Sequence, residues 1–269
     1  MRLSQVIAVL EKLYPPQWAE SWDAVGLVCG DPDAEVGRVL LAVDPVAAVV
    51  DEALRRGADL IVTHHPLLLR PVNSVAATTF KGRIVHRLIS SGVALYTAHT
   101  NADVADPGVS DALARAVGVT GPLRPLAPSP DDPARGLGRV GELPVTMPLR
   151  EFAARAAAGL PATAWGIRVA GDPDRPVRTV AVCGGSGDSL LDAARRSGAD
   201  VYLTADLRHH PASEFSEAGG PALVDAAHWA TEWPWLADAR RRLADELGLD
   251  AHVSTLRTDA WTLHFEGEQ

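Results

Sequence analysis

The stretch Asp59-Leu60-Ile61-Val62-Thr63-His64-His65-Pro66 decides the fold. Residues 59–63 are rich in apolar and β-branched side chains, which predicts a buried strand of an α/β sheet. Two adjacent histidines follow, and Pro66 stops the strand. Because the chain turns where a strand ends, both imidazoles can reach the carboxyl edge of the sheet, where open α/β sheets place ligands. Two interpretations are open: the histidines bind a metal, or they cap the strand by satisfying backbone groups.

Composition excludes several classes of protein. The 269 residues are 47% hydrophobic and carry a net charge of -9. No run of basic residues is present, which argues against general binding to nucleic acid. The two cysteines, Cys29 and Cys183, form no CxxC pair, which is typical of a reducing compartment. Residues 4–13 have helical rather than signal-peptide spacing, and no apolar run is long enough to span a membrane. We therefore expect a soluble, cytoplasmic protein.

Elements of both kinds alternate along the first half of the chain, as in an α/β fold. We predict helices at Ser4–Leu13, Val46–Arg56, Arg83–Ser90 and Val109–Val117, and further strands at Val39–Val43 and Val93–Ala98. Gly57 closes the second helix as a C-terminal glycine. Residues 121–135 are rich in Pro, Asp and Ser, so we interpret them as an exposed connection and the best candidate boundary.

The second half of the chain repeats the first. A shift of 141 positions places Gly57-Ala58-Asp59 on Gly198-Ala199-Asp200, with no gap over 30 residues. A second block, shifted by 129, places His99 on His228 and Asp103 on Glu232. A gapless match of glycine, acid and threonine at corresponding strand ends indicates duplication. The predicted division is a first α/β repeat at 1–123 and a second at 124–269.

The repeat gives each half a histidine four residues before a carboxylate. If His228 and Glu232 open a helix, they share one face of it. With His64 and His65, the chain offers up to four imidazoles and at least two carboxylates at sheet edges. This mixed nitrogen and oxygen set suits Zn, Mn, Fe, Co or Ni. It exceeds the needs of a single tetrahedral ion, so a two-metal site is favoured.

Three segments carry a family resemblance: residues 59–67, residues 99–103 and Asp225-Ala226-Ala227-His228-Trp229-Ala230-Thr231-Glu232. They resemble the signature segments of the dinuclear-metal-centre hexameric proteins, often labelled GTP cyclohydrolase 1 type 2 homologues. The likeness extends over nearly the whole chain and includes the loop at 22–27 and the turn at 183–187. The chain resembles the short form of the family, which lacks a long middle insertion.

The resemblance implies a set of metal ligands and an architecture. The ligands carried over by position are His64, His65, Asp103, His228 and Glu232, holding two divalent ions per chain. The implied fold is a duplicated α/β structure with mixed sheets and intertwined halves, and with the ligands at the carboxyl ends of strands. The implied assembly is a toroidal homohexamer. Because a carboxylate has two oxygens and Glu232 has the longer side chain, we expect Glu232 rather than Asp103 to bridge the ions.

Several positions depart from the family pattern or keep an open role. The family usually has Asn, Gly and Gly where this chain has Ala24, Ala205 and Ala227. The resemblance places His210 near the site, where it could transfer a proton, support a ligand or lie on the surface. His99 could orient a ligand rather than bind a metal.

Other residues near the signature segments have simpler interpretations. Cys183 is interpreted as a core residue rather than a nucleophile. The tryptophans at 229, 233 and 235 are expected to wall the site or pack an interface.

Two functions remain in view. The first is a dinuclear metal-dependent hydrolase that acts on a nucleotide or phosphoester through a metal-bridging hydroxide. Activity on GTP is implied only by the family label, because the sequence contains no guanine-recognition motif. The alternative is a non-catalytic, metal-binding hexamer with a regulatory or interaction role.

Overall fold

The computed structural model describes residues 1–265, which form two mixed α/β sheets with flanking helices. The strand orders are β1-β4-β3-β2-β11 and β5-β6-β8-β9-β10-β7. The chain divides into two compact units, one made of 1–105 with 236–258, the other of 106–235 with the segment that starts at Asp259. Each unit holds one of the sheets, so the predicted α/β class with mixed sheets is confirmed.

The first unit is built on the strand quoted at the outset. Its strands are β1 (Gly26–Cys29), β2 (Arg38–Ala42), β3 (Leu60–Thr63), β4 (Ala94–Thr97) and β11 (Asp250–Val253). All neighbours pair in parallel except β1, which runs antiparallel to β4. Its helices are α1 (Leu3–Leu13), the 3-10 turn η1 (Pro16–Trp18), α2 (Ala47–Arg56), α3 (Phe80–Ser90) and α4 (Thr100–Val104). The parallel strands β2, β3 and β4 therefore end at one common edge.

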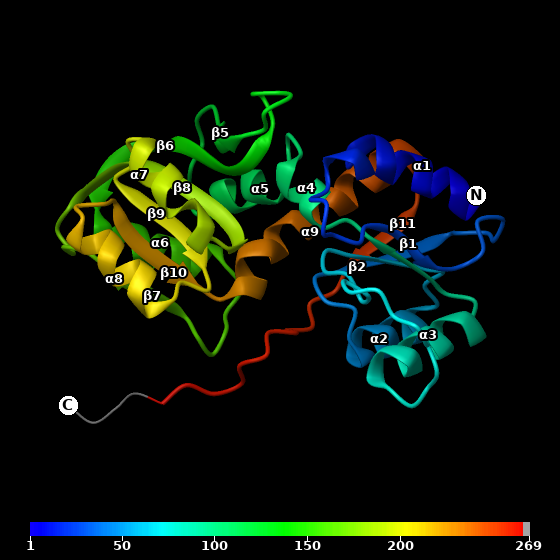
Figure 1. The fold of residues 1–269 in the computed structure, drawn as a ribbon. Coiled ribbons are helices and arrows are strands. Elements are labelled where there is room, and N and C mark those ends of the chain that lie inside the picture. Colours follow the sequence, from blue (N-terminus) through cyan, green and yellow to red (C-terminus); the bar gives the residue numbers. More distant parts are fainter. Residues whose placement is uncertain (266–269) are drawn as a thin grey trace. The chain divides into compact units, whose positions relative to one another are not determined.

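Helices α2 and α3 cover one face of this sheet (Figure 1). Val49 and Leu88 from the helices pack against Leu40, Ile61 and Leu95 from the strands, all of them buried. Gly57 ends α2 in the left-handed conformation, at φ 62°, as a glycine cap requires. The burial of both strand faces explains why β3 is a continuous apolar run rather than an alternating one.

The second unit has a longer sheet. Its strands are β5 (Arg124–Pro128), β6 (Gly136–Pro148), β7 (Ile167–Ala170), β8 (Pro176–Ser186), β9 (Val201–Ala205) and β10 (Ala222–Ala226). Its helices are α5 (Val109–Ala116), α6 (Leu149–Gly159), η2 (Asp188–Leu190), α7 (Leu191–Arg196) and α8 (His209–Glu217). Helix α9 (His228–Leu247) begins in this unit and ends in the first. Leu191 and Phe215, from α7 and α8, pack against Ala181, Tyr202 and Leu223 of the strands.

One expectation of the sequence is wrong in part. Residues 121–135 were expected to be an exposed connection, but they include β5, in which Pro125 and Leu126 are buried. Two prolines are tolerated there because β5 is an edge strand and needs few backbone donors. The other predicted helices and strands of the first half are confirmed to within about three residues at each end.

The predicted duplication has a counterpart in strand pairing. Val39 pairs with Leu60 in the first sheet and Val180 with Val201 in the second, an offset of 141 on both strands. Strands β4 and β10 also correspond, because Leu60 pairs with Ala94 in β4 and Val201 pairs with Ala222 in β10. Ala94 and Ala222 are 128 residues apart. The predicted shift of 129 is therefore wrong by one residue for β4 and β10.

The boundary predicted at 123/124 concerns the repeat and stays a prediction. The compact units are divided elsewhere, because β11 pairs with β2 in the first sheet and α5 packs on β6 and β8 in the second. Strand β11, from the C-terminal part of the chain, therefore belongs to the sheet of the first unit, as intertwined halves would require.

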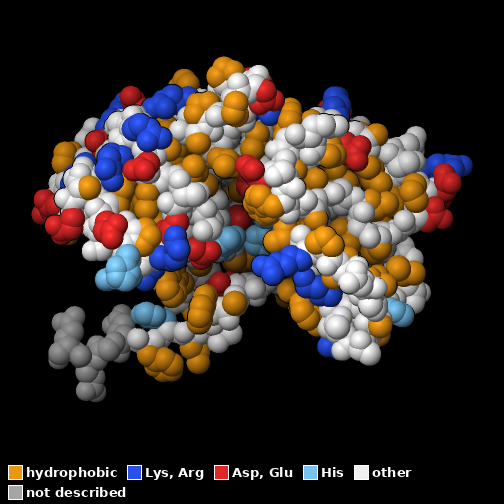
Figure 2. Space-filling view, in the orientation of Figure 1, with side chains coloured by type: hydrophobic (Ala, Val, Ile, Leu, Met, Phe, Trp, Pro, Cys, Tyr) orange, Lys and Arg blue, Asp and Glu red, His pale blue; other side chains and the backbone are white. Residues whose placement is uncertain are grey.

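Surface charge is mixed. On the face drawn in Figure 2, Lys and Arg side chains lie among Asp and Glu side chains. Within residues 1–265, no helix is long and apolar enough to cross a bilayer.

Candidate metal centre

Three histidines gather at the carboxyl edge of the first sheet. His64 and His65 follow β3, and His99 follows its neighbour β4. Because the two strands run in parallel, their ends bring the imidazoles together, with potential ligand atoms all within 4.8 Å of one another. Asp103 lies one helical turn beyond His99, on α4. The sequence left the role of His99 open, and the structure places it inside this cluster.

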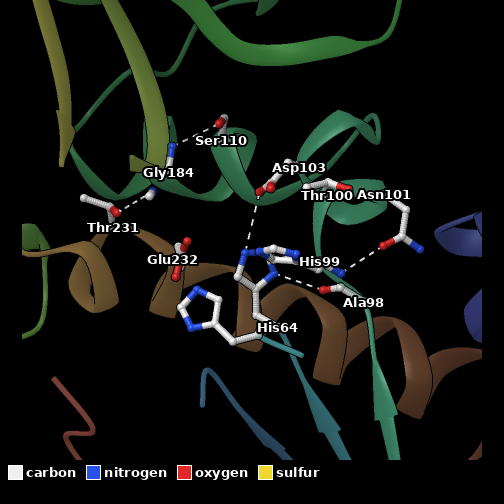
Figure 3. Close-up of polar contacts among 12 residues, drawn as sticks. His64, Ala98, His99, Thr100, Asn101, Asp103, Ser110, Gly184, Thr231 and Glu232 are labelled. Atoms are coloured by element: carbon white, nitrogen blue, oxygen red, sulfur yellow. Dashed lines mark hydrogen bonds and ion pairs between the residues drawn. The ribbon is translucent and has the colours of Figure 1, made fainter. Parts of the chain in front are cut away.

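His64 is fully buried, and its ring is fixed from one side. Its Nδ1 lies 2.9 Å from the Ala98 carbonyl oxygen, while its Nε2 lies 3.7 Å from Asp103 Oδ1 (Figure 3). A carbonyl can only accept, so Nδ1 carries the proton and donates it. The lone pair is then on Nε2, on the Asp103 side.

His65 and His99 are each held by a carboxylate. His65 Nδ1 lies 2.7 Å from Asp44 Oδ1, and His99 Nδ1 lies 2.8 Å from Asp23 Oδ1. Asp23 also accepts from the backbone N–H of Thr100, at 3.0 Å. Burial alone would raise the pKa of Asp23, but the hydrogen bonds of His99 and Thr100 outweigh it and hold that pKa well below its ordinary value. Asp23 therefore faces His99 as an anion.

The second unit carries a pair of its own at the start of α9. His228 Nε2 lies 2.9 Å from Glu232 Oε1, one helical turn on, and His228 Nδ1 lies 2.7 Å from Asp206 Oδ2. The attraction of Glu232, supported by the hydrogen bond to Asp206, outweighs burial and raises the pKa of His228 to about 11. A cation at this spot is therefore favoured, whether it is a proton or a metal ion.

Glycine makes the close packing around this pair possible. A Cβ on Gly185 would lie 2.6 Å from Glu232 Oε1 and 3.1 Å from His228 Nε2. The Gly185 N–H donates to the Thr231 hydroxyl at 2.9 Å, which ties the end of β8 to α9. Asp206 adopts φ 56°, a left-handed conformation that aspartate tolerates better than most residues. The end of β8 therefore packs closely against the His228 and Glu232 side chains.

All four imidazoles share one arrangement. Each has its Nδ1 on an oxygen acceptor, namely Ala98 O, Asp44, Asp23 or Asp206. This outer contact fixes the ring of a metal-ligating histidine and leaves Nε2 to coordinate. Imidazole and carboxylate donors suit borderline divalent ions. The residues present therefore fit a divalent metal, and the clusters could hold one.

The predicted ligands come from both compact units. His64, His65 and Asp103 lie at the edge of the first sheet, and His228 and Glu232 lie at the start of α9.

The remaining candidates lie elsewhere. His210 is exposed in the first turn of α8, with its ring 5.2 Å from that of His209, so a proton-transfer role stays a prediction. Cys183 is buried in the core of the second unit, as expected. Trp229 and Trp235 are buried, and Trp229 lies 6.4 Å from Trp233 between ring centroids.

Sequence reasoning did not assign the carboxylates that hold the rings. Asp44 and Asp206 each follow a strand closely, β2 and β9 respectively. A carboxylate just beyond a buried parallel strand, beside strand-end histidines, was a signal that could have identified both. Asp23, in the loop before β1, has no such signal.

Comparison with known proteins assigns the chain to a family. The family model described as Duf34/NIF3 (NGG1p interacting factor 3) matches residues 1–260. A Streptomyces coelicolor protein named GTP cyclohydrolase 1 type 2 homolog is 61% identical over 270 residues, covering 98% of this chain and 94% of that protein. A Mycobacterium bovis protein of the same name is 40% identical over 373 aligned positions, covering 99% and 98%. That span exceeds the 269 residues of this chain, which agrees with the predicted short form.

A solved structure gives the same answer for the fold. The Bacillus cereus structure, described as a protein related to NIF3, superposes with a TM-score of 0.90 at 26% identity, over 98% of this chain and 99% of that chain. The family-model match over residues 1–260 and the high identity to the Streptomyces protein agree with the three signature segments. The chain therefore belongs to the DUF34/NIF3 family of GTP cyclohydrolase 1 type 2 homologues.

Proposed function

We propose that this chain binds two divalent metal ions and hydrolyses a nucleotide or phosphoester. The ligands in this proposal are His64, His65, Asp103, His228 and Glu232. The observation that carries it is the shared arrangement of the imidazoles, each with its Nδ1 held by an oxygen acceptor. A strand cap does not need an oxygen acceptor placed to fix every ring.

Paired divalent ions would supply a water of lowered pKa and a clamp for charged oxygens. The protein's part is to keep the donors in place. Asp44 and Asp206 hold His65 and His228 in the tautomer whose Nε2 lone pair can bind a metal, and the Ala98 carbonyl does so for His64. The burial of His64 and Glu232 keeps bulk water from competing with substrate.

The substrate class and the assembly are supported by relatives. The name GTP cyclohydrolase 1 type 2 homolog, printed for the Streptomyces and Mycobacterium proteins, supports a nucleotide. The family resemblance supports a homohexamer. Light scattering at micromolar concentration tests the assembly, and a monomer would contradict it.

One experiment tests the activity. The purified protein, stripped of metal and then reloaded with Zn, Mn, Fe, Co or Ni in turn, is incubated with a panel of nucleotides and phosphoesters. We expect turnover that needs metal and is lost in His64→Ala and Glu232→Gln, while His252→Ala keeps it. His252 pairs with Asp250 near the end of β11 and serves as the matched control. Metal uptake without turnover on any substrate would refute the hydrolase.

That last outcome would favour the second candidate, a metal-binding interaction protein. The description of the family as an interacting factor is the observation behind it. The two candidates share the ligands and differ only in turnover.

A further inference from the structure

A small cavity in the second unit borders His228. It has a volume of about 210 Å³ and is lined by Trp165, Arg168, Asp206, His228, Asp259 and Trp261 among others. Metal binding by the proposed ligands gives the two tryptophans of this cavity no role. We infer that this cavity is a subsite for the planar heterocyclic ring of the substrate, with Trp165 and Trp261 as the residues that contact it. The inference rests on the proposed function, whose nucleotide substrate it makes more specific.

The two indoles provide an aromatic surface of suitable shape. Their ring centroids lie 6.3 Å apart and their planes are inclined by 32°. A flat ring that enters the cavity can stack on one indole and lie beside the other. Stacking between a base and an aromatic side chain is favourable for any base, because every base has a π face. The indoles therefore select for ring shape more than for a particular base.

The Trp165 side of the cavity is held in place by a buried carboxylate. The side chain of Asp225, on β10, is 7% exposed and accepts from Trp165 Nε1 at 3.3 Å and from Arg168 Nε at 3.0 Å. Its other oxygen accepts from the Leu207 N–H at 3.1 Å. The Arg168 guanidinium also lies over the Trp165 ring, 4.1 Å from its centroid. Trp165 is thus fixed before any ligand arrives, which lowers the entropic cost of binding.

Charge argues for a ring in this cavity rather than a phosphate. Arg168, whose guanidinium lines the cavity, pairs with Asp225. Asp206 and Asp259 add negative charge to the same lining. A phosphate would meet carboxylates here, whereas a neutral ring with N–H groups would meet acceptors. The phosphates of a nucleotide would then be left for the metal ions.

Trp261 is the better residue to mutate, because it is 61% exposed and its loss leaves no core cavity. Phe265 is a matched control: it lies on the same C-terminal segment, is 83% exposed and is not part of the cavity. The probes are guanosine 5′-monophosphate and ribose 5-phosphate, which share the phosphate and sugar and differ in the base. Binding of each to the metal-loaded, full-length protein is measured by titration calorimetry.

We expect Trp261→Ala to weaken binding of guanosine 5′-monophosphate about tenfold and to leave ribose 5-phosphate unchanged. Trp261→Phe should restore most of the affinity, Phe265→Ala should match the parent protein, and Trp165→Leu should behave as Trp261→Ala. Equal weakening of both probes, no effect of Trp261→Ala, or no binding of guanosine 5′-monophosphate by the parent would overturn the inference. A protein that binds the nucleotide through Trp261 but turns nothing over would support the subsite and refute only the hydrolase.

Discussion

The two parallel strands β3 and β9 hold corresponding places in the two sheets, and they begin alike but end differently. At the start, Asp59 Oδ2 accepts from the N–H groups of Gly37 and Arg38 at 2.8 and 2.9 Å. Asp200 Oδ2 accepts from Arg178 and Thr179 at 2.8 Å each, the positions 141 residues further on. At the end, β3 is followed by His64 and His65, and β9 by Asp206.

The comparison separates scaffold from chemistry. The aspartate at the amino end joins two strands in both halves and is not among the predicted metal ligands. At the carboxyl end, the position that is histidine in the first half, His65, is a carboxylate in the second, Asp206. His65 is held by an acid, Asp44, whereas Asp206 is itself the acid that holds His228. Each half therefore forms an imidazole–carboxylate pair, but the residue after the central strand is the imidazole in the first half and the carboxylate in the second.

The largest effect should come from the carboxyl end of β3. His64→Ala or His65→Ala should remove at least one of about two ions per chain, because each loses a direct donor. Elemental analysis of the purified variants measures this, with circular dichroism to show that the fold persists. His252→Ala should keep its metal. Equal metal loss in all three variants would break the assignment of the strand end to metal binding.

Glu232 and Asp103 occupy corresponding positions in the repeat, so variants of the two residues test whether the two halves have the same role in metal binding. We expect Glu232→Gln to lose one or both ions and Asp103→Asn to spare one, since a bridging carboxylate holds two cations together and an amide carries no charge. Metal analysis of the two variants side by side decides between them. The opposite ranking would assign the bridge to Asp103.

Removing the carboxylates that hold the rings should have a smaller effect. Asp44→Asn and Asp206→Asn should each weaken zinc binding about 10–100-fold, the usual cost of losing an outer partner of a ligand histidine. Competition with a chelator measures the affinity. Asp250→Asn is the control, because Asp250 lies 2.9 Å from His252 Nε2 on β11. A weakening in only one half would show that the two pairs are not equivalent.

Substitutions at the amino ends of β3 and β9 should lower the stability of the fold rather than its metal content. Asp59→Ala and Asp200→Ala each leave two backbone N–H groups without their acceptor, which should lower the free energy of unfolding by about 1–3 kcal/mol. Metal content should be unchanged. Urea unfolding measures the first and elemental analysis the second. Asp59→Asn, which keeps an acceptor oxygen, should lie closer to the parent, and metal loss in Asp59→Ala would contradict the division of roles.

The smallest effect concerns pH and belongs to the second half. In metal-free protein the raised pKa of His228, about 11, means that its charged form stabilises the fold. This contribution is complete below the unfolded value of 6.5 and is lost as pH rises towards 11. Because the imidazole is 33% exposed, solvent screens the effect. Chemical unfolding at the two pH values measures this in metal-free protein. Between about pH 7 and pH 10, the free energy of unfolding should fall less in Glu232→Gln than in the parent protein. An equal fall in both proteins would contradict the prediction.

Much of this could be predicted from local sequence, and the failures have a physical pattern. The β3 strand, its two histidines and the i, i+4 pair on α9 depend on residues close together in the chain, so periodicity identified them. Asp23 and His99 meet across 76 residues, a contact that only the folded sheet creates. Strand β5 was missed because its prolines are typical of loops, and only its place at a sheet edge makes them acceptable.

Strand β11 has a consequence for how the protein is made. It pairs with β2, and Ser254 just beyond it bonds to Leu41 O at 2.7 Å and to Glu52 Oε2 at 2.6 Å. A ribosome therefore releases residues 1–105 long before the strand that completes their sheet. Until residue 253 has emerged, the outer edge of β2 is open, and an open edge invites pairing with other chains. The first unit is translated first, but its sheet is complete only after β11 has been made. A chain truncated before β11 would leave the edge of β2 unpaired.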